Sequence, residues 1–119
     1  MEINKIGIVG SGQMGGGIAQ VCALRGFDVT VLDISDQALA KGRERLEKGM
    51  ARDVERGRLA AEDCDEALAL MSWSTEYKVF DNSDIVIEAA TEDEEIKKAI
   101  LRELCAVVPA HTLIVSNTS

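Results

Sequence analysis

The sequence predicts a doubly wound α/β fold, in which helices cover both faces of a mainly parallel sheet. Two observations predict it. Short apolar runs alternate with segments whose apolar residues recur at helical spacing, and the first apolar run leads through a glycine-rich turn into a helix. The 119 residues are 46% hydrophobic, enough for one domain with its own core. Because only 3% are aromatic, that core must be aliphatic.

The first half of the chain is expected to hold two strands and a large helical region. A long helix should run from about Ser35, a plausible N-cap, to near Gly57, because apolar residues such as Leu39, Leu46 and Met50 recur along it at helical spacing. With the next helical piece it forms a long insertion after the second strand. The other expected elements are a strand over 3–9, a helix over 13–25, a strand over 28–33 and a helix over 61–70.

The second half is expected to hold shorter strands and one amphipathic helix. Thr91-Glu-Asp-Glu94 has the pattern of a capping box. The helix that it opens should end before Pro109 and carry Ile96, Ile100, Leu101 and Leu104 on one face. The remaining elements are a short strand over 71–75, a turn of helix near 78–80, a buried strand over 85–87 and a last strand over 112–115.

The glycine-rich turn predicts a dinucleotide site. Strand, glycine loop, helix, second strand and acidic residue follow in the required order and at the required distances. Gly10 can turn tightly out of the strand, Gly12 leaves room for a phosphate, and Gly15 lets the helix pack closely. The phosphates would meet the positive N-terminus of the helix. The loop consists of Gly10, Ser11, Gly12, Gln13, Met14 and Gly15.

Asp33, at the end of the second predicted strand, indicates which dinucleotide is bound. Its carboxylate should accept hydrogen bonds from the adenosine ribose and repel a 2′-phosphate. The sequence therefore favours NAD over NADP. The alternative is a glycine-rich turn followed by an unrelated surface aspartate.

Composition argues against several other classes. The net charge is −8 and no basic run stands apart from acidic neighbours, so nucleic acid is not an expected partner. No apolar stretch reaches the length of a membrane span, and the first strand begins too close to Met1 for a signal peptide, so a cytoplasmic location is expected. Cys22, Cys64 and Cys105 are odd in number and lack metal-ligand spacing, which predicts reduced, mostly buried thiols and no metal site.

Further motifs extend along the chain: Asp84-Ile-Val-Ile-Glu-Ala-Ala90, Glu92, Ile96-Lys97 and Ser116-Asn-Thr-Ser119. Together with the glycine loop they resemble the 3-hydroxyacyl-CoA dehydrogenases, including the bacterial 3-hydroxybutyryl-CoA enzymes. The resemblance covers the whole chain. It implies a Rossmann-type NAD-binding domain over residues 1–119 and a reversible, NAD-linked oxidation of (S)-3-hydroxyacyl-CoA to 3-ketoacyl-CoA.

The resemblance also implies roles for residues near the nicotinamide end of the cofactor. Glu92 and Lys97 match positions that touch the cofactor, Ala89 and Ala90 would line the pocket, Asn117 would shape it, and Ser119 would position the substrate's 3-oxygen as the catalytic serine. The residues themselves leave other interpretations open. Glu92 could only stabilise a helix start, Lys97 could be a surface lysine paired with Asp93 or Glu94, and residues 116–118 could only form a turn.

The family's general base is a histidine that lies beyond the Ser116–Ser119 motif. His111, in the turn before the last strand, does not match it. The family's C-terminal helical domain for substrate binding and dimerisation is likewise expected to be absent from this chain. The resemblance therefore implies a homodimeric parent enzyme and a chain that is inactive by itself. Other 3-hydroxyacid dehydrogenases, or a non-catalytic crystallin-like relative, are the alternatives.

A row of basic residues follows one face of the long helix: Lys41, Arg45, Lys48, Arg52 and Arg56. It could meet the phosphates of coenzyme A, with Arg52 and Arg56 as the best candidates. The alternative is a solvated face with ion pairs such as Glu44–Lys48 and Asp53–Arg56.

Overall fold

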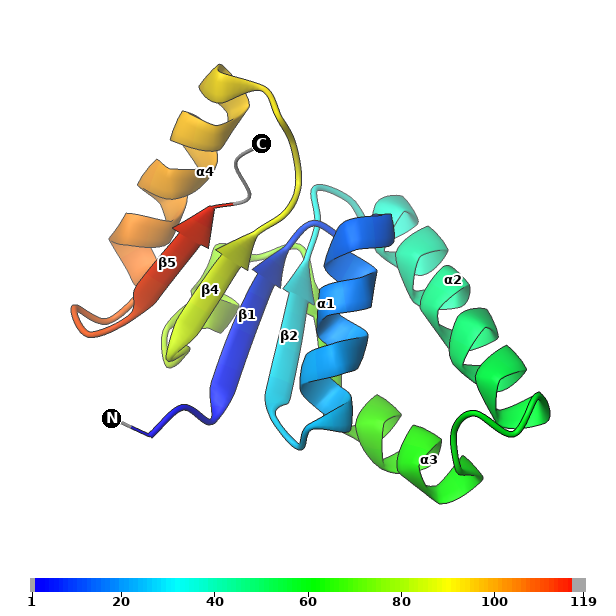
Figure 1. Ribbon diagram of the computed structural model, residues 1–119. Helices are drawn as coiled ribbons and strands as arrows, with labels where there is room; N and C mark the ends of the chain where they lie inside the picture. The colour runs from blue at the N-terminus through cyan, green and yellow to red at the C-terminus, as the bar shows by residue number, and fades with distance from the viewer. Residues whose placement is uncertain (1, 117–119) are drawn as a thin grey trace.

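The computed structural model describes residues 2–116 and contains a five-stranded parallel sheet (Figure 1). The strand order is β3-β2-β1-β4-β5. From the central β1 the chain adds β2 and β3 on one side and then β4 and β5 on the other, as the doubly wound prediction requires. The strands are β1 (Lys5–Val9), β2 (Asp28–Leu32), β3 (Met71–Ser74), β4 (Ile85–Glu88) and β5 (Leu113–Ser116).

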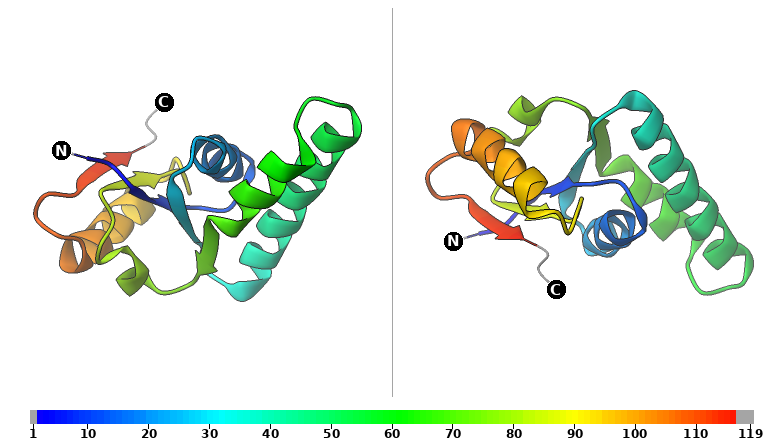
Figure 2. Two further views of the ribbon diagram at one scale, coloured as in Figure 1. Left: turned by 90° about the horizontal axis from the view of Figure 1, so that it is seen from below. Right: turned by 90° about the horizontal axis from the view of Figure 1, so that it is seen from above.

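Helices lie on both faces of the sheet, which confirms the predicted fold class (Figure 2). The helices are α1 (Gln13–Leu24), α2 (Asp36–Glu55), α3 (Ala61–Ala69), the short 3₁₀ helix η1 (Tyr77–Phe80) and α4 (Glu94–Val107). The first three pack on one face and η1 and α4 on the other. Two hydrophobic cores result, one around Ile8 and Val31 and one around Val86 and the fully buried ring of Phe80. The expectation of a purely aliphatic core is therefore wrong for the second. Successive side chains of a strand point to opposite sides, so the central strands contribute to both cores.

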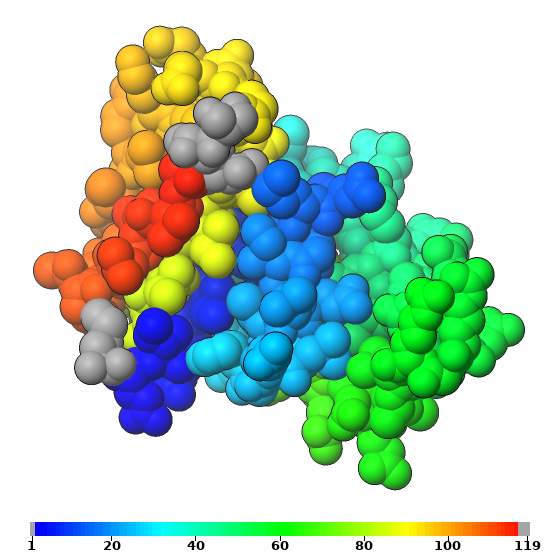
Figure 3. Space-filling view, viewed as in Figure 1, coloured from blue at the N-terminus to red at the C-terminus, as the bar shows by residue number. Residues whose placement is uncertain are grey.

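The face that α1 shares with β4 and β5 is only partly covered. Leu113 and Val115 of β5 are 55% and 47% exposed. In the space-filling view, β4 and β5 reach the surface beside α1 with no helix across them (Figure 3). Their outward side chains are therefore apolar groups in contact with solvent.

The predicted long helix begins and ends as its sequence signals indicate. Ser35 is the N-cap of α2, and its hydroxyl accepts a hydrogen bond from the backbone N–H of Ala38 at 3.1 Å. The helix ends at Glu55, and Gly57 follows with a φ of +75°, a conformation that glycine adopts without strain. The insertion of α2 and α3 between β2 and β3 confirms the expected architecture.

The predicted capping box at Thr91 is wrong, because α4 begins later. Asp93 is the N-cap, and its carboxylate accepts from the N–H groups of Glu95 and Ile96 at 2.9 and 3.1 Å. The Thr91 hydroxyl instead accepts from the N–H of Asp93 at 2.9 Å and shapes the preceding turn. Asp and Thr both cap well, so composition alone does not choose between them.

The buried face of α4 also differs from the prediction. Ile100 and Leu104 are buried, but Ile96 is 50% exposed and Lys97 is buried. Lys97, Ile100 and Leu104 are separated by three and four residues, so they share the face that packs on the sheet. Lys97 is thus buried on the face of α4 where the hydrophobic pattern predicts its neighbour Ile96.

The three cysteines are all free: Cys64 is buried, Cys22 half-buried and Cys105 exposed. Burial raises the pKa of the Cys22 and Cys64 thiols. Cys105 departs from the expectation of mostly buried thiols. Within residues 2–116, no three His, Cys, Asp or Glu side chains are grouped to hold a metal ion, and no helix is long and apolar enough to cross a membrane.

Candidate cofactor-binding site

The glycine loop leaves the carboxyl end of β1 in a conformation that needs glycine. Gly10 has a φ of +111°, and its N–H donates to the carbonyl of Leu32 at 2.7 Å. A Cβ on Gly10 would lie 2.8 Å from Cα of Ala90, in the loop after β4. A Cβ on Gly15 would collide with the carbonyl oxygen of Gly10, so the close approach of α1 to the loop excludes any larger residue.

The N-terminus of α1 is open. Gly12 is its N-cap, no side chain caps the helix, and the first turn carries no acidic residue. A Cβ on Gly12 would meet nothing within 4 Å. The unpaired N–H groups of the first turn and the positive end of the helix dipole therefore face free space, which is the arrangement that binds phosphate.

Asp33 is held at the carboxyl end of β2 by the glycine loop itself. Its Oδ2 accepts hydrogen bonds from the N–H of Ser11 at 2.8 Å and the hydroxyl of Ser11 at 2.5 Å, and its Oδ1 accepts from the N–H of Ile34 at 2.7 Å. A carboxylate has about four lone-pair positions, so one acceptor position stays open for a further donor. Asp33 is half-buried, fixed and able to accept.

Ser11 therefore has a role that its place in the loop did not reveal. It is 3% exposed, and its N–H is used by Asp33 instead of pointing at a phosphate. Its hydroxyl also lies 3.1 Å from the carbonyl of Ala38 on α2. The close packing requires a glycine on α2, because a Cβ on Gly42 would lie 2.6 Å from Cβ of Ser11. Ser11 thus joins the loop, β2 and α2.

An apolar cavity of about 270 Å³ lies beside Asp33. Ile34 lines this cavity, and 91% of its surface is exposed, which is unusual for an isoleucine. Tyr77 lines it from η1, and burial, followed by the nearby Glu103, Asp33 and Glu88 carboxylates, raises the pKa of its phenol. The lining residues are Val9, Leu32, Asp33, Ile34, Tyr77, Ala90, Thr91, Ile96 and Ile100.

Sequence reasoning missed Ile34, Tyr77 and Ile96 as site residues. The available signal was Ile34, an isoleucine placed directly after the predicted ribose-binding acid and before a helix cap. Tyr77 and Ile96 come from separate elements, so only the fold brings them beside Asp33.

The loop after β4 lies against the glycine loop. The N–H of Ala89 donates to the carbonyl of Val9 at 2.8 Å, and Ala90 contacts Gly10. Lys97 is 5% exposed, and its Nζ lies 3.7 Å from Oε1 of the fully buried Glu88. The alternative of a surface lysine paired with Asp93 or Glu94 is therefore wrong.

Glu92 is exposed and precedes the N-cap of α4 by one residue. The acids of the first helical turn are Glu94 and Glu95. A role for Glu92 in stabilising the helix start by its charge is therefore weaker than the sequence suggested.

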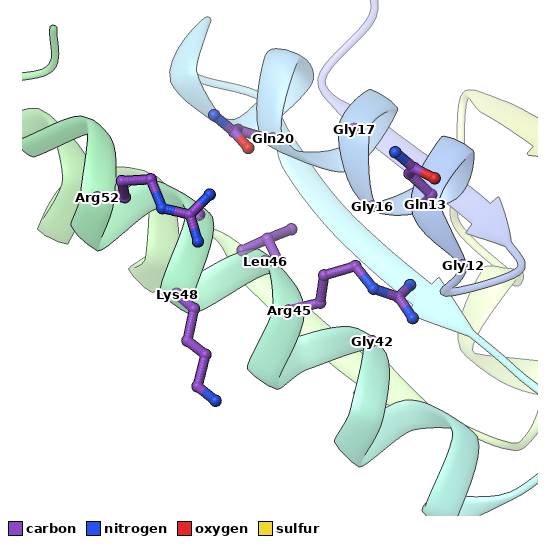
Figure 4. Close-up of a pocket in the computed structure, with 11 residues that line it drawn as sticks. Gly12, Gln13, Gly16, Gly17, Gln20, Gly42, Arg45, Leu46, Lys48 and Arg52 are labelled. Atoms are coloured by element: carbon purple, nitrogen blue, oxygen red, sulfur yellow. The ribbon is translucent and has the colours of Figure 1, made fainter.

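The basic row on α2 borders a groove of about 420 Å³ between α1 and α2 (Figure 4). Arg45 extends toward the loop around Gly12, whereas Lys48 points away from α1. Gly16 and Gly17 form a wall of the groove in which a Cβ would meet nothing within 4 Å. The groove is lined by Gly12, Gln13, Gly16, Gly17, Gln20, Gly42, Arg45, Leu46, Lys48, Gly49 and Arg52.

The alternative interpretation of the basic row, a solvated face, named two ion pairs. Lys48 pairs with Glu44 at 2.8 Å, as that alternative has it, and lowers the pKa of that carboxyl. Asp53 pairs with Arg58 at 3.9 Å, so the other pair, Asp53–Arg56, is wrong. Arg58 follows the helix in the turn and reaches back to Asp53. Arg52 lines the groove, and Arg56 does not.

His111 lies away from this site. Its Nε2 is 3.7 Å from Oδ1 of Asp84, whose Oδ2 accepts from the N–H groups of Asn4 and Lys5. These residues mark the amino ends of the strands, at the edge of the sheet opposite the glycine loop. Asn117 and Ser119 lie outside the described residues.

The comparison with known proteins now identifies the family of the chain. Residues 5–119 match the family described as 3-hydroxyacyl-CoA dehydrogenase, NAD binding domain. The chain belongs to this family. Its cofactor is NAD, and the parallel sheet with its glycine loop is the family's Rossmann-type fold.

Relatives of this NAD-binding domain agree with that membership. A 3-hydroxybutyryl-CoA dehydrogenase of Bradyrhizobium diazoefficiens is 39% identical over 98% of this chain and 40% of its own length. A 3-hydroxyadipyl-CoA dehydrogenase of Escherichia coli is 38% identical over 100% of this chain and 25% of its own.

A solved (S)-3-hydroxybutyryl-CoA dehydrogenase from Ralstonia eutropha superposes with a TM-score of 0.95 at 42% identity. The superposition covers 99% of this chain and 42% of that protein. The chain thus spans less than half the length of these relatives.

Proposed function

We propose that this NAD-binding domain serves an oxidoreductase that interconverts (S)-3-hydroxyacyl-CoA and 3-ketoacyl-CoA by hydride transfer. The observation that carries the proposal is the shared position of the open α1 N-terminus and the fixed Asp33 carboxylate. Both lie at the carboxyl edge of the sheet, beside the loop after β4. Ligands of doubly wound folds bind at this edge.

The glycine loop is suited to the pyrophosphate. The first-turn N–H groups of α1 are not capped by a side chain, so they are available as donors to phosphate oxygens. Gly10, Gly12 and Gly15 permit the close approach, and Gln13 and Met14 flank it on the exposed start of the helix. Ser11 acts differently, because it fixes Asp33.

The adenosine half fits between Asp33 and the apolar cavity. The remaining acceptor position of Asp33 would take a ribose hydroxyl, and its charge would repel a 2′-phosphate. Ile34, Tyr77 and Ile96 offer apolar surface to the faces of an adenine ring. Burial, followed by the nearby carboxylates, raises the pKa of the Tyr77 phenol, which favours its neutral form beside the ring.

The nicotinamide half would extend toward β4 and β5. We assign Ala89, Ala90, Glu92, Lys97 and Asn117 to it, with Ser119 positioning the 3-oxygen of the substrate. When bound, NAD supplies the hydride acceptor at its nicotinamide ring. The chain's own residues orient that ring and keep water away from one side of it.

The acyl-CoA would use the basic groove beside α2. Arg52 lines it and Arg56 lies one turn further on, so both remain candidates for the coenzyme A phosphates, and the structure adds Arg45. For the complete protein we further propose a cytoplasmic homodimer that binds neither nucleic acid nor membranes. This chain by itself would have no dehydrogenase activity.

Two other functions would give different results in binding and activity experiments. A dehydrogenase for small free 3-hydroxyacids would bind NAD but not respond to coenzyme A esters. A non-catalytic, crystallin-like relative would bind NAD without turnover.

The first test is a fluorescence titration of the purified chain with NADH and with NADPH. We expect saturable NADH binding and at least about tenfold weaker NADPH binding, since one lost charge-assisted contact is worth about 1.5–3 kcal/mol. Equal binding of both cofactors would contradict the role of Asp33. Binding of neither would contradict the claim that the glycine loop is a self-sufficient site.

A further inference from the structure

Glu88, at the carboxyl end of β4, is a buried charge beside the proposed nicotinamide side of the site. It is 0% exposed, and Lys97 on α4 is 5% exposed. Oε1 of Glu88 lies 3.7 Å from Nζ of Lys97 and accepts a hydrogen bond from the Ser116 hydroxyl at 3.0 Å. Burying two charges is unfavourable unless they are paired and hydrogen-bonded, and apolar side chains would often be as stable. The pair therefore calls for an explanation beyond stability.

The second oxygen of Glu88 organises the loop that follows it. Oε2 accepts hydrogen bonds from the N–H of Ala90 at 2.7 Å and the N–H of Thr91 at 3.2 Å. Both N–H groups are thereby turned inward and withheld from a ligand. One carboxylate thus connects the end of β4, the loop over 89–91, α4 through Lys97, and the end of β5 through Ser116.

The position of this connection follows from the strand order. Asp33 ends β2 and the glycine loop ends β1, so an extended dinucleotide with its ribose on Asp33 continues over β4 and β5. This step rests on the proposed function. Glu88 ends β4 in register with Val9, the last residue of β1 before the glycine loop, and the loop that it holds contacts Gly10.

We propose that Glu88 is a positioning residue for the nicotinamide half of the cofactor. It holds the Lys97 ammonium and the 89–91 loop in place, and its negative charge balances Lys97 beneath the ring. The charge balance has a consequence that packing alone would not produce. The ring of NAD⁺ carries a positive charge and the ring of NADH does not, so an unbalanced Lys97 would repel NAD⁺ selectively.

The test is a set of four proteins: the wild type, Glu88→Gln, Lys97→Met and the double variant. Their dissociation constants for NAD⁺ and NADH are measured separately. In Glu88→Gln we expect the ratio Kd(NAD⁺)/Kd(NADH) to rise about fivefold, a typical size for coupling between two sites. In Lys97→Met the ratio should fall, and in the double variant it should return near the wild-type value.

The double variant also serves as a control if a single variant fails to fold. Removing one partner of a buried pair is strongly destabilising, whereas removing both restores neutrality. Thr112→Val is the matched control, because it removes a hydrogen bond between the same two strands at their amino ends: the Thr112 hydroxyl donates to the Ser83 carbonyl at 2.6 Å. It should lower stability and leave the ratio unchanged. An unchanged ratio in Glu88→Gln would overturn the charge-balance role.

Amide hydrogen exchange without cofactor separates this proposal from the proposed function. We expect Ala90 and Thr91 to exchange about tenfold faster in Glu88→Gln, because a carboxylate is the stronger acceptor. In Thr112→Val these two amides should change no more than their neighbours. If the wild type bound neither cofactor, the proposed function would be wrong. The exchange rates of Ala90 and Thr91 would still decide whether Glu88 positions the loop. Unchanged exchange at Ala90 and Thr91 would overturn the proposal.

Discussion

At the scale of single residues, the Asp33 carboxylate is held in place by neighbouring backbone and side-chain groups. Three hydrogen bonds from Ser11 and Ile34 fix both of its oxygens. The sequence placed the acid correctly, because the order of strand, loop, helix, strand and acid is local information. It did not reveal that Ser11 holds Asp33, since that contact joins residues 22 positions apart.

Replacing Asp33 with asparagine should change which cofactor is preferred. The variant keeps the shape and an acceptor for Ser11 but loses the negative charge that repels a 2′-phosphate. We expect NADH affinity to fall about tenfold and the preference for NADH over NADPH to shrink by more than the same factor. Titrations of both cofactors measure this, with Asp28→Asn, at the exposed start of the same strand, as control. An unchanged preference would contradict the assignment.

Asp84, at the amino ends of the strands, should stabilise the folded chain in a way that depends on pH. Hydrogen bonds from the Asn4 and Lys5 N–H groups lower the pKa of its carboxyl. Because the folded-state pKa lies below the unfolded value of about 3.9, the stabilisation is complete above pH 5 and is lost as the pH falls through the folded-state pKa.

We therefore expect the free energy of unfolding, measured by urea titration from about pH 5 to pH 2, to fall less steeply for Asp84→Asn than for the wild type. Identical slopes would mean that these hydrogen bonds do not favour the charged carboxylate.

At the scale of elements, the contact between α2 and the glycine loop gives a paired prediction. A Cβ on Gly42 would meet Ser11, whereas a Cβ on Gly49, two turns along the same helix, would meet nothing within 4 Å. Gly49→Ala should stabilise the protein by about 0.5–1 kcal/mol through helix propensity. Gly42→Ala should destabilise it by about 1–3 kcal/mol and weaken NADH binding, because α2 must move away from Ser11 and Asp33.

Urea unfolding and NADH titration of the two variants give the comparison. Similar effects of both substitutions would show that the close packing of α2 on the loop is not required.

The elements also show where sequence reasoning stops. Strands and helices follow from local periodicity, and their order alone predicts that the glycine loop and Asp33 lie together at the carboxyl ends of the strands. The start of α4 did not follow, because Thr91 and Asp93 are both good caps and only the path of the chain after β4 chooses between them. The burial of Lys97 did not follow either. It depends on Glu88, a charge on another element that the pattern of α4 does not contain.

At the scale of the whole molecule, the cofactor is expected to link the two halves of the sheet. Asp33 belongs to the half built by β1, β2 and β3, and the loop over 89–91 belongs to the half built by β4 and β5. A dinucleotide that contacts both binds only the folded chain and stabilises it by mass action. At 100 times its dissociation constant, NADH should add about 2.7 kcal/mol.

For a domain of this size that corresponds to a rise in Tm of roughly 10 °C, which thermal unfolding with and without NADH would measure. AMP, which offers only the Asp33 side a ligand, should saturate without protecting the amides of Ala90 and Thr91 from hydrogen exchange, whereas NADH should protect them. If AMP protected these amides as strongly as NADH does, the nicotinamide half would not lie over β4 and β5. The assignment of Ala89, Ala90, Glu92 and Lys97 to that half would then be wrong, while the Asp33 side of the site would stand.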